Sequence, residues 1–143
     1  MSHTFKVKAK WVGGLDGHGS LQAKGIETPF SAPEDLKGSG VGANPEELLL
    51  SAASGGFILT VGAALGFQKI PVNELSIESE GELVVEGGMR VTKIHHSLVV
   101  VPARSEDSEK IAAAISRAKE MCIISKALKG NVTITVGLSQ EKR

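Results

Sequence analysis

The sequence contains no tyrosine, and its aromatic residues are limited to four phenylalanines and one tryptophan. Proteins that bind single-stranded nucleic acid stack bases on aromatic side chains, so this class of function is disfavoured. Lysine plus arginine and aspartate plus glutamate number 16 each, which leaves no net charge to attract nucleic acid or an anionic membrane surface. We therefore expect neither a nucleic-acid partner nor a membrane partner.

Cysteine is also scarce, since Cys122 is the only one in the chain. A single cysteine excludes an internal disulfide and leaves a free thiol, which suits a reducing compartment. The first residues, MSHTFKVKAKW, lack the continuous apolar stretch of a secretory signal peptide. The sequence therefore predicts a cytoplasmic protein.

Motifs that bind metals or phosphates are missing too. His95 and His96 are adjacent on a predicted strand and therefore point to opposite faces, where they cannot easily chelate one metal ion. The run Gly13–Gly19 lacks the lysine and the following helix of a phosphate-binding loop, and we interpret it as a hairpin turn. We expect no metal and no cofactor.

One long stretch has no charge, the 18 residues Leu48–Leu65. This is about the lower limit for a membrane-spanning helix, but glycine, serine and threonine dilute it and its neighbours are amphipathic. We interpret it as a helix buried on all sides. One small sheet cannot cover such a helix, so we expect a homodimer, which the small residues Ser51, Gly55, Ala52 and Gly56, spaced four apart, would allow to pack closely.

Hydrophobic periodicity predicts a single α+β domain over residues 1–143 with the element order ββ-α-ββ-α-β. The predicted strands cover 5–11, 20–26, 74–85, 90–101 and 132–138. The predicted helices cover about 44–66 and 105–129, and an irregular loop covers 28–43. In the second helix Cys122 recurs on one face with Ile111, Ile115 and Ala118 because eleven residues make about three turns, so we expect Cys122 to face inward.

The predicted central helix begins with strong helix-start signals but has two glycines in its interior. Asn44 is a good N-cap, Pro45 suits the first helical position, and Glu47 can reach back to the cap. Gly55 and Gly56 then interrupt it, although glycine in a helix interior costs about 1 kcal/mol relative to alanine. Such a local conflict often marks a functional or altered site.

Taken singly, two further residues do not identify a function. Glu46 at the helix start is explained by the helix dipole and by capping. Cys122 alone is explained as a structural buried thiol. A functional role for either needs a wider pattern.

That wider pattern lies in three segments, GANPEELLLSAASGGFILTVG, VTKIHHSLVVVPA and AISRAKEMCIISKALKG. In order and spacing they resemble the OsmC/Ohr family of thiol-dependent peroxide reductases, and the likeness covers nearly the whole chain and leans toward the OsmC branch. The resemblance implies the OsmC-like fold, a long buried central helix and an intertwined homodimer. It also implies a small-molecule hydroperoxide substrate and an external thiol or dithiol reductant.

The family's chemistry, as the resemblance implies it, uses two cysteines beside a glutamate and an arginine. One cysteine attacks the peroxide oxygen and becomes a sulfenic acid, and the second condenses with it into a disulfide. By the match to the motif, Gly56 stands where the family has the peroxide-attacking cysteine. Cys122 matches the resolving cysteine, with Ile123 in place of the proline often found after it, and Glu46 matches the glutamate.

The family's arginine has no counterpart at its usual places. The first turn of Ohr-type members has an arginine where this chain has Leu15, and OsmC-type members carry one in the loop before the helix, where this chain has Leu36 and Lys37. Two of the four catalytic parts are therefore missing, and we expect peroxidase activity to be weak or absent. The missing arginine favours natural divergence over a single introduced change at Gly56.

Beside this first hypothesis, a reductase-family protein with its two-cysteine cycle disabled, two alternatives remain open. One is a binding protein for an apolar or acyl ligand in a pocket at the dimer interface, and the other is a one-cysteine redox protein that uses Cys122. The residues expected to line the pocket are Phe57, Phe30, Phe67 and Met121.

Overall fold

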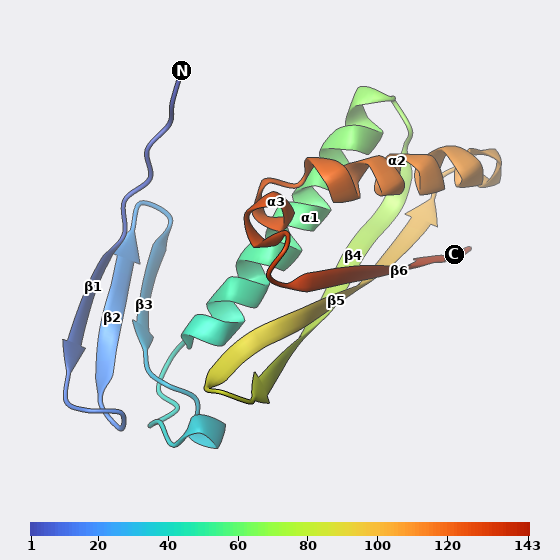
Figure 1. Ribbon diagram of the computed structural model, residues 1–143. Coiled ribbons are helices and arrows are strands. Elements are labelled where there is room, and N and C mark those ends of the chain that lie inside the picture. The colour runs from blue at the N-terminus through green and yellow to red at the C-terminus, as the bar shows by residue number, and fades with distance from the viewer. The chain divides into compact units, whose positions relative to one another are not determined.

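The computed structural model describes residues 1–143, and the chain divides into two compact units, residues 1–49 and 50–143. Figure 1 shows the elements in chain order, three strands first and then a long helix, two strands, two helices and a last strand. The mixture of antiparallel strands and helices confirms the predicted α+β class.

The first unit contains a sheet of three antiparallel strands, β1 (Lys8–Val12), β2 (His18–Ala23) and β3 (Ile26–Phe30), in that order. The predicted turn between β1 and β2 is present, and the Gly17 N–H donates to the Gly14 carbonyl at 2.9 Å. Strand β3 differs from the prediction, which ended the second strand at residue 26 and began a loop at 28. Pro29 suggested that loop, but β3 lies at the sheet edge, where proline is tolerated.

The first unit also starts the central helix α1 (Pro45–Phe67), after a short 3-10 turn, η1 (Glu34–Leu36). The Glu47 N–H donates to Oδ1 of Asn44 at 2.8 Å, and the Asn44 amide donates to the Glu47 carboxylate. The first bond is the predicted N-cap, which satisfies one backbone donor that has no partner within the helix, and the second shows Glu47 reaching back to the Asn44 side chain rather than to its backbone N–H.

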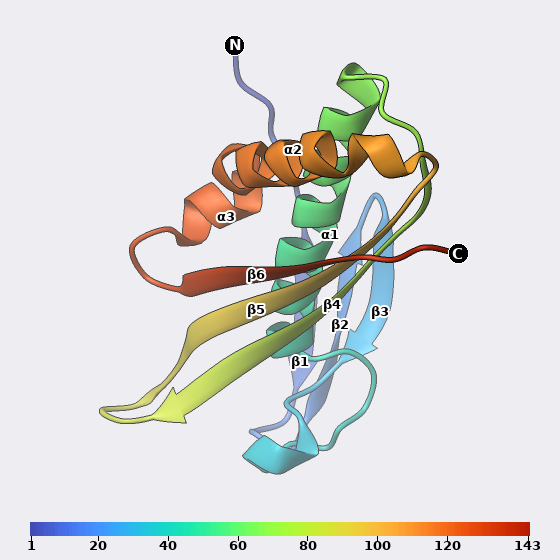
Figure 2. The same cartoon turned by 90° about the vertical axis from the view of Figure 1, so that its right-hand side faces the viewer.

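The second unit holds the rest of α1, strands β4 (Val72–Val85), β5 (Met89–Pro102) and β6 (Thr133–Gln140), and helices α2 (Ser108–Met121) and α3 (Ile123–Leu128). A 3-10 turn, η2 (Ser105–Asp107), precedes α2. Strands β4 and β5 are antiparallel, whereas β6 pairs parallel to β5 after the crossover through α2 and α3. In Figures 1 and 2, α2 crosses over α1 beside this sheet.

The core of the second unit forms between α1, α2 and strand β5. Its fully buried members include Phe57 and Val61 from α1, Leu98 from β5 and Ile111 from α2. The Cys122 side chain belongs to the same cluster. The side chain of Cys122 therefore faces inward, as its spacing predicted.

Within the chain, α1 buries one stripe only, made of Ala53, Phe57, Val61 and Leu65. The Leu59 and Phe67 side chains are 72% and 88% exposed. By length and composition α1 is long and apolar enough to cross a membrane, with a mean hydropathy of 1.9 over its most apolar window, and 22% of that window is buried. Core helices of other proteins pass the same test, and the burial on all sides that we predicted would need cover from outside the chain.

The second predicted helix is broken in two. Helix α2 ends at Met121, and Cys122 adopts an extended conformation with φ −63° and ψ 120° before α3 begins. The Cys122 N–H closes α2 on the Ala118 carbonyl at 3.1 Å, and the Cys122 carbonyl accepts from the Lys126 N–H at 3.0 Å. The prediction of one continuous helix over 105–129 is therefore wrong, and the break places the cysteine between two helix ends.

Candidate functional site

Cys122 occupies the junction between α2 and α3 as the N-cap residue of α3. Its side chain is fully buried. The side chain of Cys122 makes no capping hydrogen bond to the backbone of α3. Its sulfur lies in the core beside the first turn of α3, where backbone N–H groups have no partner within the helix.

Two effects act in opposite directions on the pKa of the Cys122 thiol. Burial raises it, because a thiolate is poorly solvated inside the protein. The Ser125 hydroxyl and the backbone N–H groups of Ser125 and Ile124 lower it because their polar hydrogens favour the charged sulfur, and Thr60 makes a smaller contribution. These lowering effects prevail, and the pKa lies below its ordinary value of 9.0.

Gly56 lies directly opposite this sulfur. A Cβ placed on Gly56 would stand 3.4 Å from Sγ of Cys122 and 3.0 Å from Cγ1 of Ile124. Thr60, one turn further along α1, donates to the Gly56 carbonyl at 2.6 Å and also contacts the cysteine sulfur. The first carbon of a side chain at position 56 would therefore be in van der Waals contact with the thiol, and the Ile124 side chain would have to shift slightly.

A buried histidine lies close to the same helix. The ring of His96 stacks on that of Phe57 with centroids 5.3 Å apart, and its Nδ1 lies 2.6 Å from Oγ of Ser79. Its Nε2 is buried without a hydrogen-bond partner. Burial, with a smaller contribution from the charge of His95, lowers the pKa of His96 below its ordinary value of 6.5, which keeps the imidazole neutral.

Glu46 lies in the first turn of α1, within the first unit, and its Oε2 is buried without a hydrogen-bond partner. No arginine occurs among residues 1–49. Leu15 is exposed in the turn between β1 and β2, and Lys37 follows η1 with φ 67°. The placement of Glu46 beside Gly56 and Cys122 stays a prediction.

The four residues expected to line an apolar pocket lie in different settings. Phe57 is buried in the core of the second unit, and Phe67 and Met121 are exposed. Phe30 belongs to the first unit, where its ring packs against Trp11 with centroids 5.2 Å apart. A ligand pocket made by these residues at a dimer interface stays a prediction. No group of three or more His, Cys, Asp or Glu side chains is placed to hold a metal ion.

Sequence reasoning missed the residues that surround the thiol, Thr60, Ile124 and Ser125. Each lies close to Gly56 or Cys122 in the chain, but single hydroxyl and aliphatic residues in helices carry no recognisable pattern. The helical spacing that predicted an inward-facing Cys122 was the one signal available. It did not identify the residues that contact the sulfur.

Comparison with known proteins gives a consistent result. The family model described as OsmC-like protein matches residues 37–137. The chain is 33% identical over 141 residues to a protein of Bacillus subtilis strain 168 described as uncharacterized protein YmaD, covering 96% of this chain and 94% of the relative. It is 27% identical over 138 residues to the organic hydroperoxide resistance protein of Xanthomonas axonopodis pv. citri, covering 94% of each.

Solved structures agree in fold. A crystal structure of an organic hydroperoxide resistance protein OsmC from Legionella pneumophila has a TM-score of 0.77 and 25% identity, covering 96% of this chain and 99% of that one. An OsmC-like protein from Mycoplasma pneumoniae has a TM-score of 0.80 at 18% identity, covering 98% and 99% of the two chains, and this second likeness concerns the fold alone.

Proposed function

The chain belongs to the family of OsmC-like proteins, and from that premise we propose that it keeps the scaffold of a thiol-dependent hydroperoxide reductase without the thiol that attacks the peroxide. The relatives named as organic hydroperoxide resistance proteins support the reductase scaffold. The glycine at position 56 supports the loss, since the family motif has its peroxide-attacking cysteine there.

One observation carries the proposal. A Cβ on Gly56 would stand 3.4 Å from Sγ of Cys122, and the sulfur atoms of a disulfide bond at about 2.05 Å. A sulfur carried on that Cβ would therefore come within reach of Cys122 after a small shift of Ile124. This is the arrangement required of an attacking thiol and a resolving thiol.

The chemistry explains why the missing thiol matters. In the two-thiol cycle, a thiolate attacks one peroxide oxygen, the O–O bond breaks, and the alcohol leaves with a proton while the sulfur becomes a sulfenic acid. The second thiol attacks that sulfur, forming S–S as S–O breaks and water leaves, and an external dithiol returns the two electrons. With glycine at position 56, the first step has no sulfur to receive the oxygen.

Peroxide consumption with a dithiol reductant tests the proposal. The natural chain should consume an organic hydroperoxide no faster than the reductant alone, whereas Gly56→Cys should consume it measurably faster. Gly66→Cys is a matched control, because Gly66 lies on the same helix about 15 Å further along and a Cβ there meets no other atom within 4 Å. Equal rates for the two cysteine variants would contradict the proposal.

The pKa of Cys122 favours a second candidate, a one-cysteine redox protein. Hydrogen bonds hold the pKa of this thiol below its ordinary value, so the reactive thiolate is more abundant than in a free cysteine. Such a protein would form a sulfenic acid at Cys122, and two molecules of an external thiol would reduce it through a mixed disulfide. If the natural chain consumes peroxide and Cys122→Ser does not, this function is established. If Cys122→Ser consumes peroxide as well, it is excluded.

We also propose that the chain is a single OsmC-like domain and forms a homodimer. The family match begins in the first unit and continues through most of the second. The exposed apolar side chains of α1, Leu59 and Phe67 among them, leave a surface that a second subunit would bury. A cytoplasmic location stays a prediction.

A further inference from the structure

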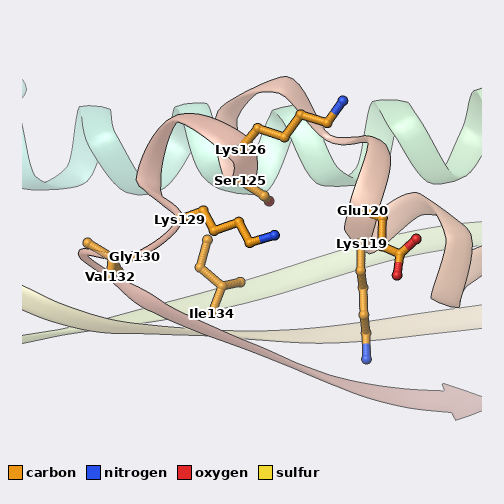
Figure 3. A pocket seen from close by; sticks show the side chains of 8 residues that line it. All are labelled: Lys119, Glu120, Ser125, Lys126, Lys129, Gly130, Val132 and Ile134. Atoms are coloured by element: carbon orange, nitrogen blue, oxygen red, sulfur yellow. The ribbon is translucent and has the colours of Figure 1, made fainter.

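A hollow opens on the second unit between α2, α3 and strand β6, with a volume of about 510 Å³. Figure 3 shows the Ser125 and Lys129 side chains pointing into the space between α3 and β6, with Lys119 reaching down from α2. The residues that line the hollow are Lys119, Glu120, Ser125, Lys126, Lys129, Gly130, Val132 and Ile134.

The charges around this hollow are unbalanced. Three lysines line it against one carboxylate, that of Glu120. None of these lysines takes part in an ion pair, because all three ion pairs in the structure are made by Arg104 and Arg143. In Figure 3 the Lys126 side chain points up and away from the hollow, so the positive potential in this concave place comes mainly from Lys119 and Lys129.

We propose that this hollow binds a small anion that carries phosphate groups. Lysine ammonium groups are common phosphate ligands, and the hydroxyl of Ser125 can donate a further hydrogen bond. Val132 and Ile134 form an apolar wall of the hollow, which suits an organic portion attached to the phosphate. The Glu120 carboxylate can accept a hydrogen bond from a hydroxyl or amino group on that organic portion.

The helix ends explain only part of this arrangement. Lys119 lies in the last turn of α2 and Lys126 in the last turn of α3, where cations stabilise the helix dipole. That effect does not require Lys119 to line the same hollow that Lys129 enters, where the two positive charges repel each other. A bound anion removes the repulsion.

The hollow adjoins the thiol site through one side chain. Ser125 lines the hollow and also hydrogen-bonds to the sulfur of Cys122. The binding inference does not depend on the peroxide chemistry proposed above, because none of the three lysines contacts Gly56 or Cys122 in the interactions described.

Isothermal titration calorimetry of the full chain with inorganic pyrophosphate, at constant ionic strength, tests the inference. We expect saturable binding of one pyrophosphate per chain. The double variant Lys119→Ala with Lys129→Ala should weaken that binding at least tenfold. The control is Lys110→Ala with Lys142→Ala, which removes the same charge from exposed positions outside the hollow.

The two double variants separate a built site from general charge attraction. Weakened binding in the first variant only supports the hollow as the site. Equal weakening in both, or no saturable binding to the natural chain, would overturn the inference and leave the lysines as helix-end residues. Thermal unfolding of each variant without ligand shows whether it folds, and Lys129→Ala alone gives a second, milder comparison.

Discussion

Sγ of Cys122 lies 3.4 Å from the position that a Cβ on Gly56 would occupy. The two residues are far apart in the chain, and helix α1 and the break between α2 and α3 bring them together. Ile124 stands at the same place, 3.0 Å from that Cβ position. The glycine therefore faces a buried thiol, and an isoleucine side chain lies against the same position.

The first prediction concerns the hydrogen bonds that support the Cys122 thiolate. The Ser125 hydroxyl lowers the pKa of Cys122, whereas burial raises it. Ser125→Ala removes the hydroxyl and leaves the effect of burial, so the pKa of Cys122 should rise. The measurement is the ultraviolet absorbance of the thiolate as a function of pH. The chain has one cysteine and no tyrosine, so no tyrosinate signal overlaps.

Ser116→Ala supplies the control for that titration. Ser116 is exposed on α2, and its removal should leave the thiolate curve where it is. A Ser125→Ala curve that coincides with the natural one would show that the backbone donors of α3 alone set the pKa of Cys122.

The second prediction is a loss of stability in acid caused by His96. Its pKa is lowered in the folded chain by burial and by His95, so the unfolded chain binds the proton first as pH falls. The contribution of the neutral His96 to the free energy of unfolding should therefore be fully present above pH 6.5. Below that pH the free energy of unfolding should decrease by up to about 1.4 kcal/mol per pH unit.

Urea unfolding at several pH values measures this slope. His96→Gln should be less stable at neutral pH, because it loses the stacking on Phe57, and should also lose part of the acid slope. His18→Gln, at an exposed position of β2, should keep the slope of the natural chain. Identical slopes in all three proteins would show that His96 does not set the acid response.

The third prediction concerns the homodimer. Leu59→Glu places a charge on the exposed apolar surface of α1, and we expect it to weaken the dimer by at least tenfold. Val85→Glu is a matched control, since both side chains are 72% exposed and Val85 lies at the end of β4. Sedimentation should give a dimer for the natural chain and for the control, and a larger monomer fraction near 14.9 kDa for Leu59→Glu.

A natural chain that sediments as a monomer would contradict the dimer. In that case the exposed side chains of α1 would need another partner. Equal effects of the two substitutions would show that the contact does not involve the middle of α1.

Local signals in the sequence predicted the local structure well. The N-cap Asn44 and the glycine turn after β1 depend on neighbouring residues only, and both were confirmed. Strand β3 was missed because Pro29 is read as a breaker, although the sheet edge tolerates it. The strand alternation also separated His95 from His96 correctly, and His96 alone is buried.

The break at Cys122 shows what the sequence does not contain. Neither glycine nor proline occurs between Met121 and Lys129, so periodicity predicted one helix. The Cys122 side chain is buried in the core against α1 at this break, a tertiary contact that periodicity does not show. The closeness of Gly56 to Cys122 came from the family resemblance rather than from any pattern, and the surrounding hydroxyl residues carried no signal at all.

Disulfide formation in Gly56→Cys tests the central claim most directly. Under a mild oxidant, the new thiol should pair with Cys122 within one chain, and both thiols should become inaccessible to an alkylating reagent until a reductant is added. Gly66→Cys should keep both thiols free under the same conditions. If Gly56→Cys also keeps both thiols free, position 56 does not face Cys122, and the account of a reductase scaffold without its first thiol is wrong.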